Sequence, residues 1–589
     1  MKRVAAIVVV LTLACASARV IAAQAPKGVV QGVVTDDTGG ALPGVTVTLY
    51  AKPQRTVVTD ANGAFQIIGV PPGTYEIRAH LPGFSTASFR VTVAGEVGAS
   101  LSIPLRMSSV AETITVTAAA PRLGRAIPTA SYSVSGLDTG APRPTYAKTK
   151  EHAFVATKNE RTTTFAIDVD RASYANVRRM IASGLQVPPD AVRIEELVNY
   201  FPWSYPQPDG DAPFSVTSEV AGCPWNAEHR VLRVGIQGRS LEQWKMAPNN
   251  LVFLIDVSGS MDGPDRIGLL ISSFRVLVDQ LRAEDVVSIV VYAGAAGLVL
   301  PPTSGADKAT ILAALDRLDA GGSTAGGAGI ELAYRIAKQN FIKGGNNRVI
   351  LATDGDFNVG VNSVADLEKL IEAKRKSHIF LSALGVGDDN YRDDMLETLA
   401  DKGNGNYAYL DSPQEAEKVF RHELTGTLVT IAKDVKVQLQ FDPKQVASYR
   451  QIGYENRSLA NKDFDDDAKD AGELGAGHSV TALFEIVPTK TWAPGSLGTL
   501  RLRWKAPTGE TSTPLVTTID DGGKSAYDAS PDMQFAAAVA QFGMLLRNSP
   551  HKGTASWDDV LSLAKIAAGA DLDGTRKEFM ALAEKARPR

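Results

Sequence analysis

Residues 250–261 read NLVFLIDVSGSM, and this stretch decides the fold of the largest part of the chain. Residues 251–255 are all apolar, and Asp256 follows them directly. A strand that is buried on both faces of a parallel sheet has this composition. From residue 250 to residue 430, strand-like and helix-like patterns alternate. We therefore predict a doubly wound (Rossmann-like) α/β sheet, in which binding sites lie at the carboxyl ends of the strands.

Oxygen-bearing side chains are concentrated at the predicted carboxyl ends of these strands. Asp256, Ser258 and Ser260 form a D-x-S-x-S pattern, Thr324 precedes a helix, and Asp354 ends a second apolar run. Carboxylates and hydroxyls are hard ligands that suit Mg²⁺. A helix-capping role is the alternative for Asp and Ser after a strand. The occurrence of three such elements in order, each at a strand-to-helix junction, favours a metal site.

The sequences DVSGS (256–260) and TDG (353–355), together with Thr324, resemble the metal-ion-dependent adhesion site of von Willebrand factor type A domains. The resemblance implies that Asp256, Ser258, Ser260, Thr324 and Asp354 hold Mg²⁺, with Mn²⁺ or Ca²⁺ as alternatives. It also implies that the metal keeps one position open for an Asp or Glu of a partner protein. FAIDVDRASYANVRRMI (165–181) and the segment ending in GYENR (453–457) resemble the N-terminal extension and the dedicated C-terminal domain of a bacterial subgroup of this family.

Residues 28–107 carry short strand patterns that are separated by dense turn signals. TDDTGG (35–40), TDANG (59–63) and PPG (71–73) are such turns. Strands at this spacing favour a small all-β sandwich. The order of strands and turns resembles the carboxypeptidase regulatory-like domain, a transthyretin-like module without catalytic activity. The chain contains neither H-x-x-E-H nor H-E-x-x-H, so a peptidase zinc site of these types is not predicted.

The N-terminus has the parts of a secretory signal peptide, predicted over residues 1–23. A basic start precedes a short apolar run and small residues, with cleavage after Ala18 or Ala23 as alternatives. Lipidation of Cys15 is a further alternative, although Thr12 stands where a lipobox prefers Leu. We expect export to the periplasm, the cell envelope or the surface. No later stretch approaches ~18 consecutive apolar residues, so no integral membrane span is expected after cleavage.

Overall composition is that of a globular protein. The chain has 589 residues and is 44% hydrophobic, with 61 Lys and Arg against 65 Asp and Glu. This balance gives no support to nucleic-acid binding. The predicted organisation is a signal peptide (1–23), the sandwich (28–107), a linker rich in Ala, Ser, Thr and Pro (108–160), the N-terminal extension (161–248), the type A domain (249–430) and a β-rich and helical C-terminal domain (431–589).

Other motifs give weaker signals. The run DFDDD (463–467) begins like an EF-hand loop, but Ala468 and Leu474 stand where that loop requires Gly and Glu. An acidic turn is the better interpretation, with weak calcium binding as a minor alternative. No G-x-x-x-x-G-K-[ST] phosphate loop is present, so hydrolysis of nucleoside triphosphates is not predicted.

The sequence favours an exported, non-enzymatic, adhesion-type protein that binds an acidic residue of a partner through its metal. A structural envelope scaffold with a stabilising metal is the first alternative. A metal-dependent hydrolase is the second alternative. Against it, the predicted ligand set contains no histidine, and no general base is identifiable nearby in the sequence. The sequence leaves the partner, the metal and the oligomeric state open.

Overall fold

The computed structural model describes residues 28–36, 40–50, 55–60, 62–81, 84, 87–93, 99–105, 146–167, 170–242, 246–293, 296–321, 326–355, 364–387, 391–423, 429–469, 471–507, 509–569, 571 and 573–588. The chain divides into two compact units, Met1–Thr113 and Ile114–Arg589, and each is described by itself. The predicted signal peptide and most of the predicted linker lie outside the described residues.

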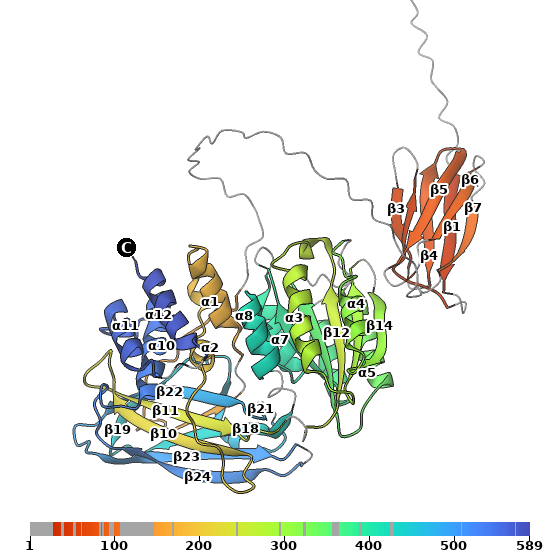
Figure 1. Cartoon of the computed structure of the whole chain (residues 1–589). Helices are drawn as coiled ribbons and strands as arrows, with labels where there is room; N and C mark the ends of the chain where they lie inside the picture. The colour runs from red at the N-terminus through yellow and green to blue at the C-terminus, as the bar shows by residue number, and fades with distance from the viewer. Residues whose placement is uncertain are drawn as a thin grey trace, which may run out of the picture. The chain divides into compact units, whose positions relative to one another are not determined.

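The first unit is an all-β sandwich (Figure 1). One sheet has the order β4-β1-β7 and the other β3-β2-β5-β6. Alternate residues face the shared core, so that Ile77 and Ala79 of one strand are fully buried. The predicted sandwich is confirmed, and its strands are β1 (Gly28–Thr35), β2 (Thr46–Leu49), β3 (Arg55–Val58), β4 (Ala64–Val70), β5 (Gly73–His80), β6 (Ala87–Val93) and β7 (Ala99–Pro104).

The second unit contains the predicted doubly wound α/β domain. Its sheet has the order β14-β13-β12-β15-β16-β17, in which only β14 runs antiparallel to its neighbour. The strands are β12 (Asn249–Asp256), β13 (Val286–Tyr292), β14 (Ala296–Ser304), β15 (Asn346–Thr353), β16 (Phe380–Gly385) and β17 (Tyr407–Tyr409).

Helices cover both faces of this sheet, as Figure 1 shows. Apolar side chains of β12 point alternately into two separate cores, one under each layer of helices. Phe253 stacks on Phe274 at 4.4 Å between ring centroids in the first core. The helices are η3 (Gly259–Met261), α3 (Ile267–Gln280), α4 (Lys308–Leu315), α5 (Gly326–Gln339), α6 (Val364–Arg375), α7 (Asp393–Lys402), α8 (Pro413–Glu417) and η4 (Lys418–Glu423).

A second β-sandwich is built jointly by the N-terminal extension and the C-terminal region. Its sheets have the orders β10-β11-β22-β19-β8 and β20-β9-β18-β23-β24, with β21 paired to β18. The strands are β8 (Val155–Ala156), β9 (Thr162–Ala166), β10 (Phe214–Gly222), β11 (Arg230–Gly238), β18 (Thr430–Phe441), β19 (Val446–Ile452), β20 (Ser458–Leu459), β21 (Gly472–Gly475), β22 (Ser479–Pro488), β23 (Gly495–Lys505) and β24 (Thr513–Asp521). The short strand β8 lies within the segment predicted as linker.

A layer of helices packs on the outer face of the first of these sheets. Ile452 and Leu483 of the sheet share a core with α10, which is buried along almost its whole length. Ser530 caps α10 by accepting a hydrogen bond from the Met533 amide. The helical elements are α1 (Ala172–Ala182), η1 (Pro189–Ala191), α2 (Ile194–Asn199), η5 (Asn461–Phe464, which lies in the sandwich), α10 (Pro531–Arg547), α11 (Trp557–Ile566) and α12 (Thr575–Ala586).

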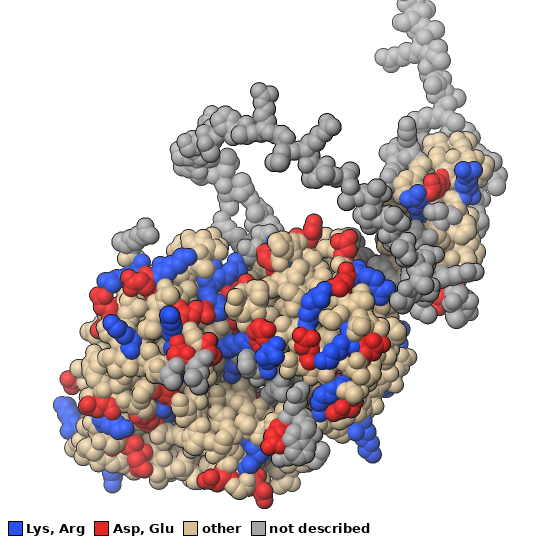
Figure 2. Space-filling view, in the orientation of Figure 1, with Lys and Arg blue, Asp and Glu red and all other residues tan. Residues whose placement is uncertain are grey.

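The α/β domain is therefore an insertion. The chain leaves the sandwich after β11, forms the α/β domain, and returns in β18, which pairs with β9 from before the insertion. Within the described residues, no helix is long and apolar enough to cross a membrane. On the face that Figure 2 shows, acidic and basic side chains are interspersed over this unit.

Candidate metal centre

The carboxyl edge of the α/β sheet brings two predicted metal ligands together. β12 ends at Asp256, and its parallel neighbour β15 ends at Thr353, one residue before Asp354. Neighbouring parallel strands end at the same edge of a sheet, so both carboxylates belong to that edge. A hydrogen bond of 2.9 Å from Thr353 Oγ1 to Asp256 Oδ2 joins the two strand ends.

Asp256 is held in place by the backbone that follows it. Its Oδ1 accepts a hydrogen bond of 2.9 Å from the Ser258 amide, and its side chain is fully buried. Burial raises the pKa of Asp256 to about 6, the negative charge of Asp354 adds to this rise, and hydrogen bonds from Ser258 and Thr353 oppose it. Within the described residues Asp256 makes no ion pair. Its negative charge is therefore left without a protein cation.

The two serines lie beside this carboxylate. Ser258 Oγ and Ser260 Oγ are 3.0 Å apart, and Ser258 is almost fully buried. Ser258 precedes the short helix η3 but makes no side-chain capping bond to it. The capping alternative therefore does not account for the Ser258 hydroxyl. A hydrogen bond from Arg266 to the Ser260 carbonyl fixes the loop before α3.

Gly355 shapes the loop that carries Asp354. Its φ is +97°, in the left-handed region where only glycine is free of steric cost. Its amide donates to Thr353 Oγ1 at 3.1 Å, the same hydroxyl that donates to Asp256. The TDG sequence thus links the turn at Asp354 to the carboxylate of β12.

The donor chemistry fits a divalent cation that prefers oxygen. The described residues contain no group of three or more His, Cys, Asp and Glu side chains that could hold a metal. The edge instead offers two carboxylates and two hydroxyls, and it lacks the nitrogen and sulfur ligands that zinc prefers. Thr324 lies outside the described residues, so its place in the ligand set stays a prediction.

A second group of buried carboxylates lies elsewhere on the α/β domain and was missed by the sequence analysis. Asp393, Glu397 and Asp401 follow one another at intervals of four residues, which places them on one face of α7. Arg193 from the N-terminal extension and Arg457 from the C-terminal region meet them. We call these five residues the carboxylate seam.

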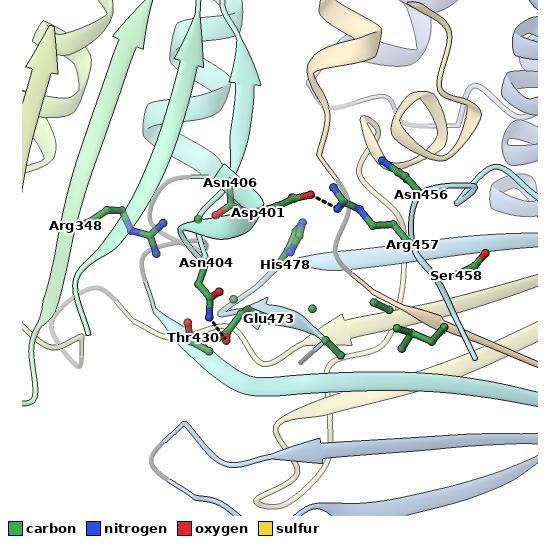
Figure 3. Close-up of a pocket in the computed structure, with 16 residues that line it drawn as sticks. Arg348, Asp401, Asn404, Asn406, Thr430, Asn456, Arg457, Ser458, Glu473 and His478 are labelled. Carbon is green, nitrogen blue, oxygen red and sulfur yellow. Dashed lines mark hydrogen bonds and ion pairs between the residues drawn. The ribbon is translucent and has the colours of Figure 1, made fainter. Parts of the chain in front are cut away.

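The seam is densely paired. Arg193 Nη2 lies 2.7 Å from both Asp393 Oδ2 and Glu397 Oε2. Arg457 Nη2 lies 3.3 Å from Glu397 Oε1, and Arg457 Nη1 bonds Asp401. Figure 3 shows the last of these contacts. Arg457 ends GYENR (453–457), a motif that the sequence assigned to the C-terminal domain of the subgroup. The spacing of the three carboxylates at i, i+4 and i+8 was the available signal for its partners.

The acidic run at residues 463–467 is occupied by cations of the protein itself. Lys505 Nζ donates to the Asp467 carbonyl at 2.6 Å, and Lys436 Nζ donates to the Asp463 carbonyl at 3.1 Å. Arg503 pairs with Asp465 and Asp467, each at 3.0 Å. The carboxylates of Asp465 and Asp467 are thus bound by a protein cation, which agrees with the acidic-turn interpretation.

Comparison with known proteins gives the class of the chain. The profile of the von Willebrand factor type A domain matches residues 250–422, and that of von Willebrand factor matches residues 141–233. The carboxypeptidase regulatory-like domain matches residues 29–106. The chain is thus a von Willebrand factor type A domain protein with an N-terminal regulatory-like module, as the sequence predicted.

A relative then identifies the family. The uncharacterized protein YfbK of Escherichia coli (strain K12) is 44% identical over 450 residues, which cover 72% of this chain and 77% of the relative. The profile of the YfbK C-terminal region matches residues 426–496 and 492–588. The chain belongs to the YfbK family.

More distant similarities are confined to parts of the chain. The uncharacterized protein sll0103 of Synechocystis sp. is 31% identical over 204 residues, covering 34% of this chain and 46% of that protein. The solved structure of a von Willebrand factor type A protein from Catenulispora acidiphila is 20% identical and covers 64% of this chain and 91% of its own, with a TM-score of 0.38.

Proposed function

We propose that the chain is an exported, non-enzymatic protein that binds a partner protein through a divalent cation. The proposed ligands are Asp256, Ser258, Ser260, Thr324 and Asp354, and their oxygen chemistry favours Mg²⁺. A cation held there supplies an electrophilic position for an Asp or Glu carboxylate of the partner. The periplasm, the cell envelope or the surface is the proposed location.

One observation carries the proposal: the fully buried Asp256 carboxylate has no ion pair within the described residues. A buried charge is costly unless it is paired or bound to a metal. Asp354 adds negative charge at the same place. Hydrogen bonds from Ser258 and Thr353 already orient Asp256, so the carboxylate does not have to be ordered when a cation arrives. Membership of the type A class, whose members commonly mediate protein interactions, agrees with this role.

The scaffold alternative uses the same cation for stability alone. The hydrolase alternative would need a general base near the edge. Within the described residues, no histidine contributes to the group formed by Asp256, Ser258, Ser260 and Asp354. Binding therefore agrees better with the donor set than water activation does.

The test begins with the metal and continues with the partner. Isothermal titration with MgCl₂ should show one site in the full mature chain, and Asp256→Ala should abolish it. Asp316→Ala, which removes an exposed carboxylate of the same domain, is the matched control. Capture from the envelope fraction is then compared for wild type in Mg²⁺, wild type in EDTA, and Asp256→Ala in Mg²⁺.

A protein retained only by wild type in Mg²⁺ supports metal-dependent recognition. Identical captures in all three conditions, with Mg²⁺ binding intact, would leave the scaffold alternative. Fractionation and N-terminal sequencing of the mature chain test export, with cleavage expected after Ala18 or Ala23.

A further inference from the structure

The first turn of α5 packs directly on the ends of the strands that carry the proposed metal site. Gly329 belongs to this turn and is buried. A Cβ atom added to Gly329 would lie 3.0 Å from Tyr292 Cβ and 3.1 Å from Leu254 Cδ1. Since a methyl group forced into a packed interior displaces its neighbours, only glycine lets α5 lie this close to the sheet without such a shift.

The two neighbours of Gly329 flank a proposed ligand. Leu254 precedes Asp256 by two residues in β12, so both side chains lie on the same face of the sheet. Tyr292 is the last residue of β13 and the register partner of Asp256. Leu254 and Tyr292 are fully buried and share a core with Ile330 of α5. The contact at Gly329 therefore fixes how closely α5 approaches the face on which Asp256 lies.

The position of α5 matters because this helix follows a second proposed ligand. Thr324 precedes Gly326, the first residue of α5, by two positions in the chain. Two residues span at most about 7 Å, so the start of α5 limits the distance between Thr324 and the sheet. A displacement of α5 away from β12 and β13 would thus widen the ligand set that Asp256 and Thr324 belong to.

Ion size connects this separation with metal preference. Mg²⁺ requires oxygen ligands at about 2.0–2.1 Å in near-ideal octahedral geometry, whereas Ca²⁺ accepts ligands at about 2.3–2.6 Å in a flexible geometry. A closely packed interior leaves little room for ligands to adjust. A site whose loops are held together by packing therefore favours the smaller ion, and a widened site loses more affinity for Mg²⁺ than for Ca²⁺.

We propose that the close packing of Gly329 on Tyr292 and Leu254 makes the metal site selective for Mg²⁺ over Ca²⁺. This inference rests on the proposed function, because it concerns the same site. Gly329 is a positioning residue: it has no side chain to bind the ion, and it acts through the place that it gives to α5.

The experiment is isothermal titration of the full mature chain with MgCl₂ and, separately, with CaCl₂. Wild type should bind Mg²⁺ more tightly than Ca²⁺. Gly329→Ala should weaken Mg²⁺ binding at least tenfold and Ca²⁺ binding less than threefold, so that the ratio of the two affinities falls. Circular dichroism in EDTA checks that the metal-free variant is folded.

Gly268→Ala is the matched control. Gly268 lies in the first turn of α3, which follows the loop of Asp256, Ser258 and Ser260. Within the described residues, a Cβ atom there would meet only the Gly263 carbonyl oxygen, at 3.5 Å, an ordinary van der Waals separation. Gly268→Ala should change neither affinity, because the same substitution in the same part of a helix here finds room.

A double variant tests whether the contact itself is responsible. Leu254→Val removes the Cδ1 atom that the new methyl group would meet, so Gly329→Ala with Leu254→Val should recover part of the Mg²⁺ preference. If Gly329→Ala does not fold, the double variant is compared with wild type directly, and its affinity ratio should lie below the wild-type value.

Two outcomes would overturn the proposal. One is an affinity ratio in the folded variant that equals the wild-type ratio, and the other is a wild-type chain that prefers Ca²⁺. Failure of wild type to bind either ion is a different result, since it would contradict the proposed function on which this inference depends.

Discussion

The carboxyl edge of the α/β sheet carries the proposed metal site, with Asp256, Ser258, Ser260 and Asp354, and is called the metal-site edge. This edge and the carboxylate seam use the same residue type in opposite ways. Both place buried carboxylates on the α/β domain. At the seam, Glu397 lies against two guanidinium groups, whereas Asp256 has no protein cation within the described residues. Buried carboxylates that the protein neutralises itself hold domains together, and those it leaves unneutralised are candidates for an external cation. The following predictions test this difference.

The largest effect is expected at the seam. Arg193→Ala leaves Asp393, Glu397 and Glu196 without their shared cation, and loss of one partner of a buried ion pair costs about 3–5 kcal/mol. Urea unfolding measures this change. Arg275→Ala, which breaks an exposed pair with Asp316, is the control and should change little. Equal effects of the two variants would show that the seam does not depend on its buried charges.

A smaller effect is expected from the cation. Mg²⁺ at 100 times its dissociation constant should stabilise the folded chain by about 2.7 kcal/mol, because it binds the folded state alone. Asp256→Asn should remove this gain without unfolding the metal-free protein. Thermal unfolding in MgCl₂ and in EDTA measures both. A Mg²⁺ gain that persists in Asp256→Asn would place the cation elsewhere.

Glu195 provides an intermediate case, since it is a buried carboxylate that lies near both a cation, Arg547, and an anion, Glu455. Burial and the neighbouring Glu455 raise the pKa of Glu195 to about 7, which Arg547 opposes. The folded state then binds a proton that the unfolded state releases between pH 4.5 and 7. Stability from this group is present below pH 4.5 and is lost as the pH rises through 7.

Glu195→Gln should therefore stabilise the chain by about 3 kcal/mol at pH 8 and by almost nothing at pH 4.5, given 1.36 kcal/mol per pKa unit. Urea unfolding at the two pH values measures the difference. Glu372→Gln, at an exposed site, is the control. A gain that is the same at both pH values would mean that the Glu195 carboxylate is ionised throughout.

The smallest change in stability is expected at the serines of the metal-site edge. Ser258→Ala removes one hydroxyl contact, worth about 1 kcal/mol or less in the metal-free chain. Its effect should fall on Mg²⁺ affinity, which titration measures. Unchanged affinity would remove Ser258 from the ligand set.

Local patterns were sufficient to predict the α/β domain. The continuous apolar run of residues 251–255 lies within β12, and the predicted alternation of strands and helices over residues 250–430 is the observed order of elements. The edge strand β14 was not predicted, because Pro301 and Pro302 look like a break. Proline is tolerated there since an edge strand leaves its outer backbone groups unpaired.

Long-range pairing was beyond the reach of sequence patterns. β9 contributes Phe165 opposite Val437 of β18, across the whole inserted domain. Periodicity identifies strands but does not identify partners that are this distant in sequence. For the candidate site, the sequence predicted that Asp256 and Asp354 follow neighbouring strands. Asp256 ends β12, Asp354 follows β15, and a hydrogen bond from Thr353 to Asp256 joins the two strand ends. That these residues hold a metal stays a prediction. The role of Thr324 stays a prediction.

The insertion also has a kinetic consequence. In the first sheet of the second sandwich, β22 lies between β11 and β19. Because β22 follows the α/β domain in the chain, β11 cannot pair with β22 until the ribosome has synthesised the entire α/β domain. Until residue 488 has been synthesised, the hairpin of β10 and β11 presents an open edge that invites pairing with other chains. All strands of the α/β sheet come from one contiguous segment, residues 249–409, so this sheet can form during the interval. Vectorial synthesis therefore favours an early α/β domain and a late sandwich, whose closure depends on the last third of the chain.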